Sequence, residues 1–383
     1  MQHTWLLVLV IVLAVSFDFT NGFHDTANAM ATSIATGALK PRVAVALSGV
    51  LNLVGAFLSV SVAATIASGI VDSARVTLPI IFAGLLGAIG WNVATWYFGL
   101  PSSSSHALVG GVIGATVVAA GFSAIKGSSI LSKVIVPALL SPFIAALVAG
   151  LATFLAYRIS QLNKPAQAER TKSTFRYGQL ASASLVSLAH GTNDAQKTMG
   201  IVTLALIADH RLGKHAGPPF WVILMCGLAI SAGTYLGGWR VIRTVGHRLF
   251  HIEAPQGFAA ETASAAVLLI STHAGAPLST TQVTTGGVIG AGLGKNASEV
   301  KWGTAGRMVT AWILTIPAAA VVAAAIGLVT KNGNVVGVVV MTVLAATVLA
   351  GVWLRSRTSP VNADNVNEDA RPNPEPARAG AAV

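Results

Sequence analysis

The stretch NGFHDTANAM at residues 21–30 has a second copy, HGTNDAQKTM, at residues 190–199, and this pair decides the fold. A glycine, an aspartate and a methionine stand at the same three positions of both copies, as Gly22, Asp25 and Met30 in the first. The copies are offset by 169 residues, a little under half of the 383-residue chain. Self-similarity at so long a period indicates a duplicated structural unit.

A second pair of stretches recurs at a similar distance. PSSSSH at residues 101–106 and PLSTTQ at residues 277–282 both begin with proline and continue with hydroxyl residues, and three glycines follow each at the same spacing. The offset of this pair is 176 residues. Because two different motifs recur in the same order, the duplicated unit is a whole half of the chain.

The composition is that of a membrane protein. Hydrophobic residues make up 54% of the chain and charged residues 10%, against about 25% charged residues in a typical soluble domain. Several apolar runs reach the roughly 20 residues that a helix needs to cross a bilayer. The net charge is +11, but the basic residues lie between the apolar runs without interleaved aromatics, which argues against a nucleic-acid partner. Cys226 is the single cysteine, so no disulfide framework is available.

Eleven apolar segments divide into two halves. They span residues 5–37, 43–70, 77–99, 106–125, 134–157, 178–207, 219–239, 258–274, 281–294, 304–330 and 334–354. The first and the sixth carry the duplicated motif and are predicted to be interrupted helices. The predicted division is a first membrane repeat (1–157), a cytoplasmic linker (158–177), a second, inverted membrane repeat (178–355) and a disordered cytoplasmic tail (356–383).

The two halves are predicted to have opposite orientations in the membrane. Five segments precede the polar linker, and an odd number of crossings starts the second half from the other face. On this topology seventeen lysines and arginines fall on the side of the linker and six on the other, while Lys197 lies inside an apolar segment. The excess places the linker and the C-terminus in the cytoplasm and the N-terminus outside.

The fold class expected is an all-α polytopic membrane protein with an inverted-topology repeat, broken helices and re-entrant hairpins. If the segments around residues 101–106 and 277–282 each dip into the membrane as a hairpin, the odd number of crossings is preserved and the two tips meet near the midplane. Non-helical backbone is tolerated at that depth where it lines a polar cavity.

These motif pairs resemble the signatures of the PiT family of inorganic phosphate transporters. The paired Gly-x-Asn-Asp-type signatures of the family correspond to residues 22–29 and 191–198, and its Pro-x-Ser-Thr-Thr-like tips correspond to residues 101–106 and 277–282. The resemblance covers essentially residues 1–355. It implies an inverted-repeat fold, uptake of phosphate coupled to a cation gradient, and a homodimer.

The resemblance also bears on the coupling ion. Bacterial proton-coupled members look most similar, because His24 and Lys197 stand where many sodium-coupled relatives have asparagine. The expected function is a symporter of the bacterial inner membrane that imports inorganic phosphate, free or as a metal–phosphate complex, with H+ rather than Na+. Phosphate and the lipid bilayer are the expected partners. We expect no enzyme activity and no cofactor.

Two acidic residues in apolar surroundings require a function. An ionised carboxylate at bilayer depth costs at least a few kcal/mol, so Asp25 and Asp194 are candidates for binding a coupling ion. Glycine and amide residues beside each of them favour unwound backbone, which exposes carbonyl groups to a cation. With Asn28 and Asn193 the two aspartates could hold Na+, or the aspartates could carry protons. Asp18, about two helical turns before Asp25, is a further candidate on the same path.

The hydroxyl tips are the candidate anion site. Unpaired N–H groups and the positive end of the helix dipole at the start of a helix bind an anion without a fixed cation. The residues expected to bind phosphate are Ser103, Ser104, Ser105, Ser279, Thr280 and Thr281.

Four further residues are candidates for coupling. Lys197 stands three residues after Asp194, on the same face of a helix, where it forms either a purely structural ion pair or part of the coupling. Histidine can act as an acid or a base at physiological pH, so His24 and His190 are either proton relays or hydrogen-bonded packing groups. Glu261 is a coupling candidate because the family has a functionally important glutamate in this region.

Three other functions fit part of the pattern. An intramembrane hydrolase would use Ser105 and His106, but neighbouring side chains do not face each other on a helix, and nucleophile-elbow and nucleotide motifs are absent. A di-metal site built from the histidines and aspartates of the motifs would leave the duplicated hydroxyl tips unexplained. A passive anion channel or a carrier for another oxyanion such as sulfate is separated from a phosphate carrier only by the family resemblance.

Overall fold

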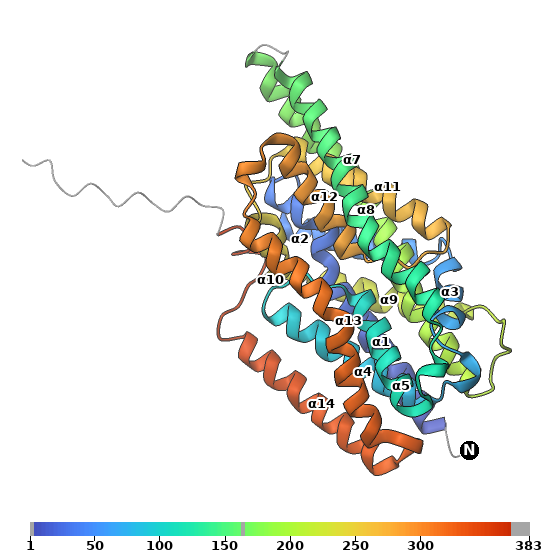
Figure 1. Cartoon of the computed structure of the whole chain (residues 1–383). Coiled ribbons are helices and arrows are strands. Elements are labelled where there is room, and N and C mark those ends of the chain that lie inside the picture. Colours follow the sequence, from blue (N-terminus) through green and yellow to red (C-terminus); the bar gives the residue numbers. More distant parts are fainter. Residues whose placement is uncertain (1–3, 162–164, 369–383) are drawn as a thin grey trace, which may run out of the picture.

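The computed structural model describes residues 4–161 and 165–368, and these residues form helices and connecting turns without a β-strand. The helices are α1 (Thr4–Ala35), α2 (Pro41–Ala56), α3 (Ser61–Gly69), α4 (Leu78–Tyr97), α5 (Ser104–Ala120), α6 (Gly127–Ile130), α7 (Val136–Gln161), α8 (Pro165–Ala208), α9 (Phe220–Leu236), α10 (Trp239–His247), α11 (Ala254–His273), α12 (Thr280–Lys295), α13 (Trp302–Thr330) and α14 (Val335–Ser356). Figure 1 shows them packed into one bundle, from which the ends of α7 and α8 project.

All eleven predicted apolar segments form helices, which confirms the all-α membrane class. The predicted segment 43–70 forms the bent pair α2 and α3, and the segment 219–239 forms α9, which makes a second bent pair with the following α10. Among the described residues, five spans are long and apolar enough to cross a membrane, and counting each bent pair as one span raises the number to seven. The five are Thr4–Ala35, Leu78–Tyr97, Gly127–Ile159, Trp302–Thr330 and Val335–Ser356.

The helix breaks do not lie at the duplicated motif. α1 and α8 run without interruption through both copies, whereas α2 and α3 meet at 71° and α9 and α10 at 64°. The motif glycines serve close packing instead: a Cβ on Gly22 would lie 2.2 Å from the Ile230 carbonyl oxygen, and one on Gly191 would lie 2.3 Å from the Asn52 carbonyl oxygen. Small residues allow such close approach of membrane helices. The prediction of unwound backbone beside the two aspartates is therefore wrong.

The two hydroxyl tips are the turns of hairpins that meet inside the protein. α4 and α5 form one hairpin around Pro101, and α11 and α12 form the other around Pro277. α5 has 17 residues and α12 has 16, fewer than a full crossing requires. The hydroxyl of Ser105 lies 3.4 Å from the carbonyl oxygen of Leu278, so the two tips touch, as the re-entrant arrangement predicts.

Each hairpin packs against a long helix of the other half. A Cβ on Gly110 of α5 would lie 2.4 Å from the Ile316 carbonyl oxygen of α13. The equivalent contact joins Gly286 of α12 to the Pro142 carbonyl oxygen of α7, at 2.5 Å. Because equivalent glycines make equivalent contacts, the repeat is present in the packing as well as in the sequence. The two halves interlock and share one interior.

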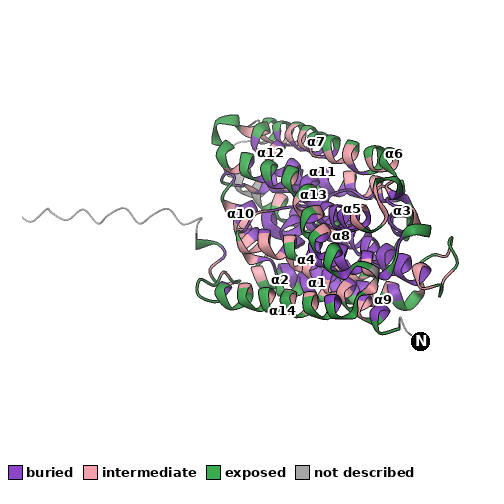
Figure 2. Cartoon of the chain, turned by 60° about the horizontal axis from the view of Figure 1, so that its bottom comes forward, coloured by how far each residue is buried: buried purple, intermediate pink, exposed green. Residues whose placement is uncertain are grey.

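The outer faces of several helices are apolar and exposed. Examples are Leu147 on α7, Ile313 on α13 and Val336 on α14. Figure 2 shows α7 and α14 largely exposed at the periphery, around inner helices that are mostly buried. Polar side chains are concentrated inside the bundle instead, which is the distribution expected of a protein surrounded by lipid.

The segments predicted to be linker and tail are partly ordered. Residues 158–161 end α7 and residues 165–177 begin α8. After α14 the chain returns to the bundle, where Val366 is fully buried and Asp364 lies 3.1 Å from Arg42. The prediction that disorder begins at residue 356 is therefore wrong for residues 357–368. These residues bind to basic side chains of the bundle such as Arg42 and Arg243, and the composition of the tail alone does not reveal such contacts. Residues 369–383 lie outside the described residues.

Candidate functional site

The two copies of the duplicated motif place their aspartates beside each other. Asp25 on α1 and Asp194 on α8 are 1% and 0% exposed. One carboxylate oxygen of each, together with a ring nitrogen of His190, forms a group of atoms that all lie within 4.8 Å of one another. Helices distant in sequence therefore build a single buried site, and each half of the chain contributes one carboxylate to it.

Asp25 forms hydrogen bonds with His24, its neighbour in sequence, and with the second hairpin tip. Nδ1 of His24 lies 2.6 Å from Asp25 Oδ1, and the Thr281 hydroxyl donates to the same oxygen at 3.2 Å. Asn28, one turn further along α1, donates its amide to the hydroxyls of Thr281 at 3.0 Å and Thr280 at 3.3 Å. The first copy of the motif is thus joined to the hairpin of the second half.

Asp194 is paired with a lysine instead. The ammonium of Lys197 lies 2.6 Å from Asp194 Oδ1, and Nε2 of His190 lies 3.5 Å from Oδ2. The Thr280 hydroxyl donates to Oδ2 at 3.1 Å. The second tip therefore contacts both carboxylates, through Thr281 on one and Thr280 on the other.

Lys197 lies where the two tips meet. Besides Asp194, its ammonium donates to the Ser105 hydroxyl of the first tip at 2.5 Å and to the Leu278 carbonyl oxygen of the second at 2.8 Å. An ammonium has three N–H donors, so these three acceptors use all of them. A carboxylate, a hydroxyl and a carbonyl oxygen form the kind of oxygen set that also surrounds a bound hard cation.

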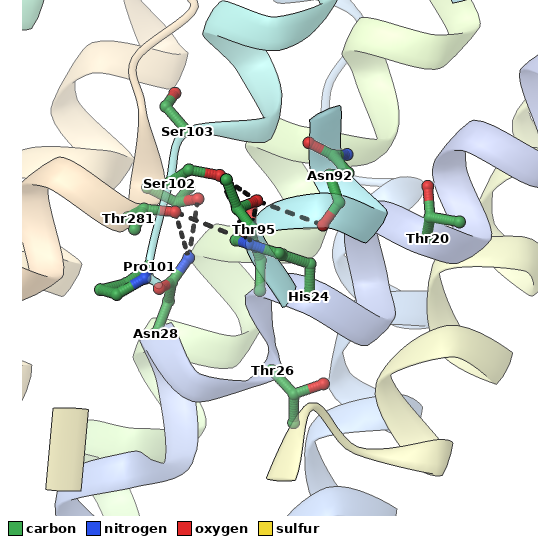
Figure 3. A network of polar contacts seen from close by, with 12 residues as sticks. Thr20, His24, Thr26, Asn28, Asn92, Thr95, Pro101, Ser102, Ser103 and Thr281 are labelled. Atoms are coloured by element: carbon green, nitrogen blue, oxygen red, sulfur yellow. Dashed lines mark hydrogen bonds and ion pairs between the residues drawn. The ribbon is translucent and has the colours of Figure 1, made fainter. Parts of the chain in front are cut away.

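A chain of polar contacts leads from Asp25 to the first tip. Nε2 of His24 lies 3.3 Å from the Thr95 hydroxyl and 3.4 Å from the Ser102 hydroxyl, which are themselves 2.7 Å apart. Figure 3 shows these side chains converging from α1, α4 and the tip, with Asn28 and Thr281 beside them. His24 thereby joins the first carboxylate to the tip of its own half.

Two of the predicted phosphate ligands hold the tips in shape. The hydroxyl oxygen of Ser103 accepts from the His106 N–H at 3.2 Å, and that of Ser279 accepts from the Gln282 N–H at 3.3 Å. Both are helix N-caps, which satisfy one of the free N–H groups of the first turn. The remaining first-turn N–H groups of α5 and α12 lie at the tips, at the positive end of each helix dipole. Ser104 is buried there, and its hydroxyl has no hydrogen-bond partner among the described residues.

Asn193 and Glu261 do not join the central network. Asn193 donates its amide to Thr272 at 2.8 Å and not to a residue of the tips. Glu261 lies in a separate buried cluster, where its carboxylate accepts from hydroxyl and amide donors of α1 and α8. These donors are Thr32 and Ser33 at 2.6 Å each, Ser182 at 2.5 Å and Gln179 at 3.3 Å.

Sequence reasoning did not identify several partners in these networks. Thr95 lies six residues before the first tip, and Thr32 lies seven residues, about two helical turns, after Asp25, so helical spacing could have suggested both. The roles of Gln179 and Ser182 could not be predicted from the sequence, because only the packing of α8 against α11 brings them to Glu261.

The arrangement suits the binding of ions rather than covalent catalysis. The Ser105 hydroxyl is held by Lys197, and His106 is its neighbour on α5, so these two residues do not form a serine–histidine pair. Hydroxyls, helix N-termini and an ammonium can bind an anion, while the paired carboxylates can bind protons or cations.

Comparison with known proteins places the chain in a family of phosphate transporters. Residues 21–323 match the family model of the phosphate transporter family. A probable low-affinity inorganic phosphate transporter of Mycobacterium bovis is 56% identical over 367 residues, which cover 95% of this chain and 87% of that protein. A probable low-affinity inorganic phosphate transporter of Rhizobium meliloti is 44% identical over 320 residues, which cover 83% of this chain and 95% of that protein.

A solved structure has the same fold. It is described as the sodium-dependent phosphate transporter, and it matches with a TM-score of 0.76 over 85% of this chain and 99% of its own. The sequence identity is 24%, so the likeness supports the fold of the bundle and its hairpins.

Proposed function

The chain belongs to the phosphate transporter family, and from this premise we propose that it imports inorganic phosphate together with protons. It is a multi-pass membrane transporter and not an enzyme. The anion is bound where the two hairpin tips meet, and the two motif aspartates couple its movement to the cation gradient.

The observation that carries this proposal is the position of Lys197. Its ammonium bridges Ser105 of one tip and Leu278 of the other, next to Asp194. Phosphate that enters between the tips takes over the hydroxyls and N–H groups there, and it offers Lys197 a new anionic partner. The contact between the tips is thereby exchanged for contacts through the ligand, which is how substrate binding can change the state of a carrier.

The choice of H+ over Na+ follows from the asymmetry between the two motif copies. A cation bound beside Asp194 would need the oxygen atoms that the Lys197 ammonium already occupies. In the first copy the equivalent residue is Asn28, and Asp25 is held by His24 instead. Each carboxylate therefore already has a basic side chain of the protein as its partner, which disfavours sodium at the pair and leaves the proton as the coupling ion of this proposal.

Uptake of radiolabelled phosphate into proteoliposomes tests the proposal. An inward proton gradient in sodium-free buffer should drive accumulation, and an inward sodium gradient at equal pH should not. Excess sulfate should leave the uptake unchanged. Accumulation driven by sodium alone would refute proton coupling, and strong competition by sulfate would favour a general oxyanion carrier.

A metal–phosphate complex is a second candidate substrate. The ligand atoms of Asp25, His190 and Asp194 lie within 4.8 Å of one another, a spacing that a divalent cation travelling with phosphate could bridge. Uptake of radiolabelled divalent metal that depends on phosphate, at a constant ratio, would support this form. Phosphate uptake unaffected by chelators would support free phosphate.

The placement in the membrane is also proposed. The excess of lysine and arginine on the side of the linker favours a cytoplasmic C-terminus and an external N-terminus in the bacterial inner membrane, and the family resemblance favours a homodimer. Labelling of single cysteines introduced at residues 214 and 357 from either side of the membrane would test the orientation. Residue 214 should react from outside, and residue 357 only after permeabilisation.

A further inference from the structure

Asp18 is a buried carboxyl group that the site at the tips leaves without a role. It lies on α1 seven residues before Asp25, about two turns or 10 Å along the helix. It is 0% exposed, and neither of its carboxylate oxygens has a hydrogen-bond partner of normal geometry. The buried carboxylates Asp25, Asp194 and Glu261 all have such partners.

The nearest side chains around Asp18 are uncharged. Asn21 on α1, Thr198 on α8 and the thiol of Cys226 on α9 face it. The Thr198 hydroxyl and the amide oxygen of Asn21 are buried and also lack a hydrogen-bond partner of normal geometry. A buried polar group left unsatisfied costs about 1–3 kcal/mol, so a set of facing unpaired oxygens indicates a shared hydrogen between them.

The charged groups that face Asp18 do not neutralise it. Both lie on α8: Asp194 has the same sign, and the ammonium of Lys197 has its three N–H donors engaged by Asp194, Ser105 and Leu278. An ionised Asp18 would therefore be a carboxylate at bilayer depth without a counter-charge, which is costly.

Helices α2, α4, α9 and α10, which also pack against α1, offer no counter-charge either. On α9 the titratable groups are the thiol of Cys226 and the exposed phenol of Tyr235, and neither is a cation. α4 has no titratable side chain before Tyr97, and α2 has none after Arg42. The basic residues of α10 belong to the far end of α1, where Gly246 packs beside Ala31.

We propose that Asp18 is a proton-binding site of the transport cycle and that it carries its proton in the conformation described here. One proton satisfies the whole group, because the carboxylic acid donates to the Asn21 amide oxygen while its carbonyl oxygen accepts from the Thr198 hydroxyl. The proton is taken from water on one side of the membrane and returned to water on the other, and no other bond is formed or broken.

The position of Asp18 also explains how the proton is linked to phosphate. Thr198 follows Lys197 directly on α8, so the residue that meets the ligand is next to the residue that meets Asp18. When phosphate becomes the partner of Lys197, the ammonium neutralises the charge of Asp194 less completely. The negative charge of Asp194 then favours the protonated form of Asp18. By reciprocity, protonation of Asp18 favours phosphate binding. This inference rests on the proposed proton coupling and names a residue that carries the proton.

Two measurements on Asp18→Asn test it, with Asp364→Asn at the exposed tail as the matched control. Infrared spectra of the purified protein should contain a carbonyl band of a protonated carboxyl that disappears in Asp18→Asn and persists in Asp364→Asn. Thr198→Val should shift the same band. In proteoliposomes, Asp18→Asn should lower proton-driven net uptake by about tenfold or more and leave phosphate–phosphate exchange within about threefold of wild type.

The outcomes separate this inference from the proposed function. An unchanged carbonyl band in Asp18→Asn, or normal proton-driven uptake by that variant, would overturn the role of Asp18. Sodium-driven uptake by the wild type would refute the proposed proton coupling, and the loss of the band would then still identify Asp18 as a protonated group. If Asp18→Asn does not accumulate in the membrane, Thr198→Val is the test instead. A shifted carbonyl band in that variant would support the protonated Asp18, and an unshifted band would overturn the proposal.

Discussion

The ammonium of Lys197 lies 2.5 Å from the hydroxyl of Ser105, and this contact joins the motif of the second half to the hairpin tip of the first. The two residues are 92 positions apart in the sequence and belong to different halves of the chain. Neither motif is complete without the other, because the tips of both hairpins and the aspartates of both long helices converge on one buried point.

Removing the hydroxyls at this point should impair phosphate uptake. Ser105→Ala leaves one N–H of Lys197 unpaired, and Thr281→Val removes the donor to Asp25 and the acceptor for Asn28. A lost hydrogen bond to a charged or buried partner costs about 1–3 kcal/mol, so each variant should lose about ten- to hundredfold in uptake efficiency. Radiolabelled uptake measures this, with Ser132→Ala on an exposed turn as the control.

The two aspartates should both be required for coupled transport. Asp25→Asn and Asp194→Asn remove the negative charge while keeping the shape, so the folded protein should still reach the membrane. Proton-driven uptake should fall to background, because the basic partners His24 and Lys197 are left uncompensated. Near-normal uptake by both variants would remove the carboxylates from the mechanism.

The motif glycines should matter for stability rather than chemistry. In Gly22→Ala the new methyl group would lie 2.2 Å from the Ile230 carbonyl oxygen, which forces α1 and α9 apart. Overpacking of this kind costs about 1–3 kcal/mol, so the variant should unfold at lower temperature in detergent. Gly306→Ala on α13, where a methyl group has open space around it, should be neutral or stabilising by up to about 1 kcal/mol. Equal unfolding temperatures for both variants would contradict the packing role.

Glu261 should be needed as a hydrogen-bond acceptor. Four side chains from α1 and α8 donate to its carboxylate, among them Ser182 at 2.5 Å and Thr32 at 2.6 Å. Glu261→Gln replaces one acceptor oxygen by an N–H donor, so at least one hydroxyl must turn away and the uptake rate should fall about tenfold. Glu299→Gln, at a surface pair with Lys295, is the control and should transport normally. Wild-type rates in Glu261→Gln would show that the cluster is only structural.

The sequence predicted the long helices and drew attention to the residues that lie together in the buried site, for identifiable reasons. Each long membrane helix contains an apolar run, and the aspartates and tips stand out because polar residues are rare in such runs and here occur twice. The duplication also predicted that the tips meet, which the contact between Ser105 and Leu278 agrees with.

The features that could not be predicted depend on contacts between helices. A glycine close to an aspartate in sequence is consistent with an unwound helix and also with two helices that cross at close range. The close contacts with the carbonyl oxygens of Ile230 and Asn52 show that these glycines serve close helix packing. Likewise, Gln179 reaches Glu261 because α8 packs against α11, and Val366 is buried because the chain returns to the bundle after α14. Spacing along one helix contains none of this information.

Phosphate binding by the purified protein tests the central claim most directly. The wild type should bind radiolabelled phosphate in sodium-free buffer, and more tightly at lower pH because protons and phosphate bind together. Lys197→Met, which removes the ammonium at the junction of the tips, should lose this binding, while Lys214→Met in an exposed loop should keep it. Phosphate binding by Lys197→Met with wild-type affinity and pH dependence would contradict the account.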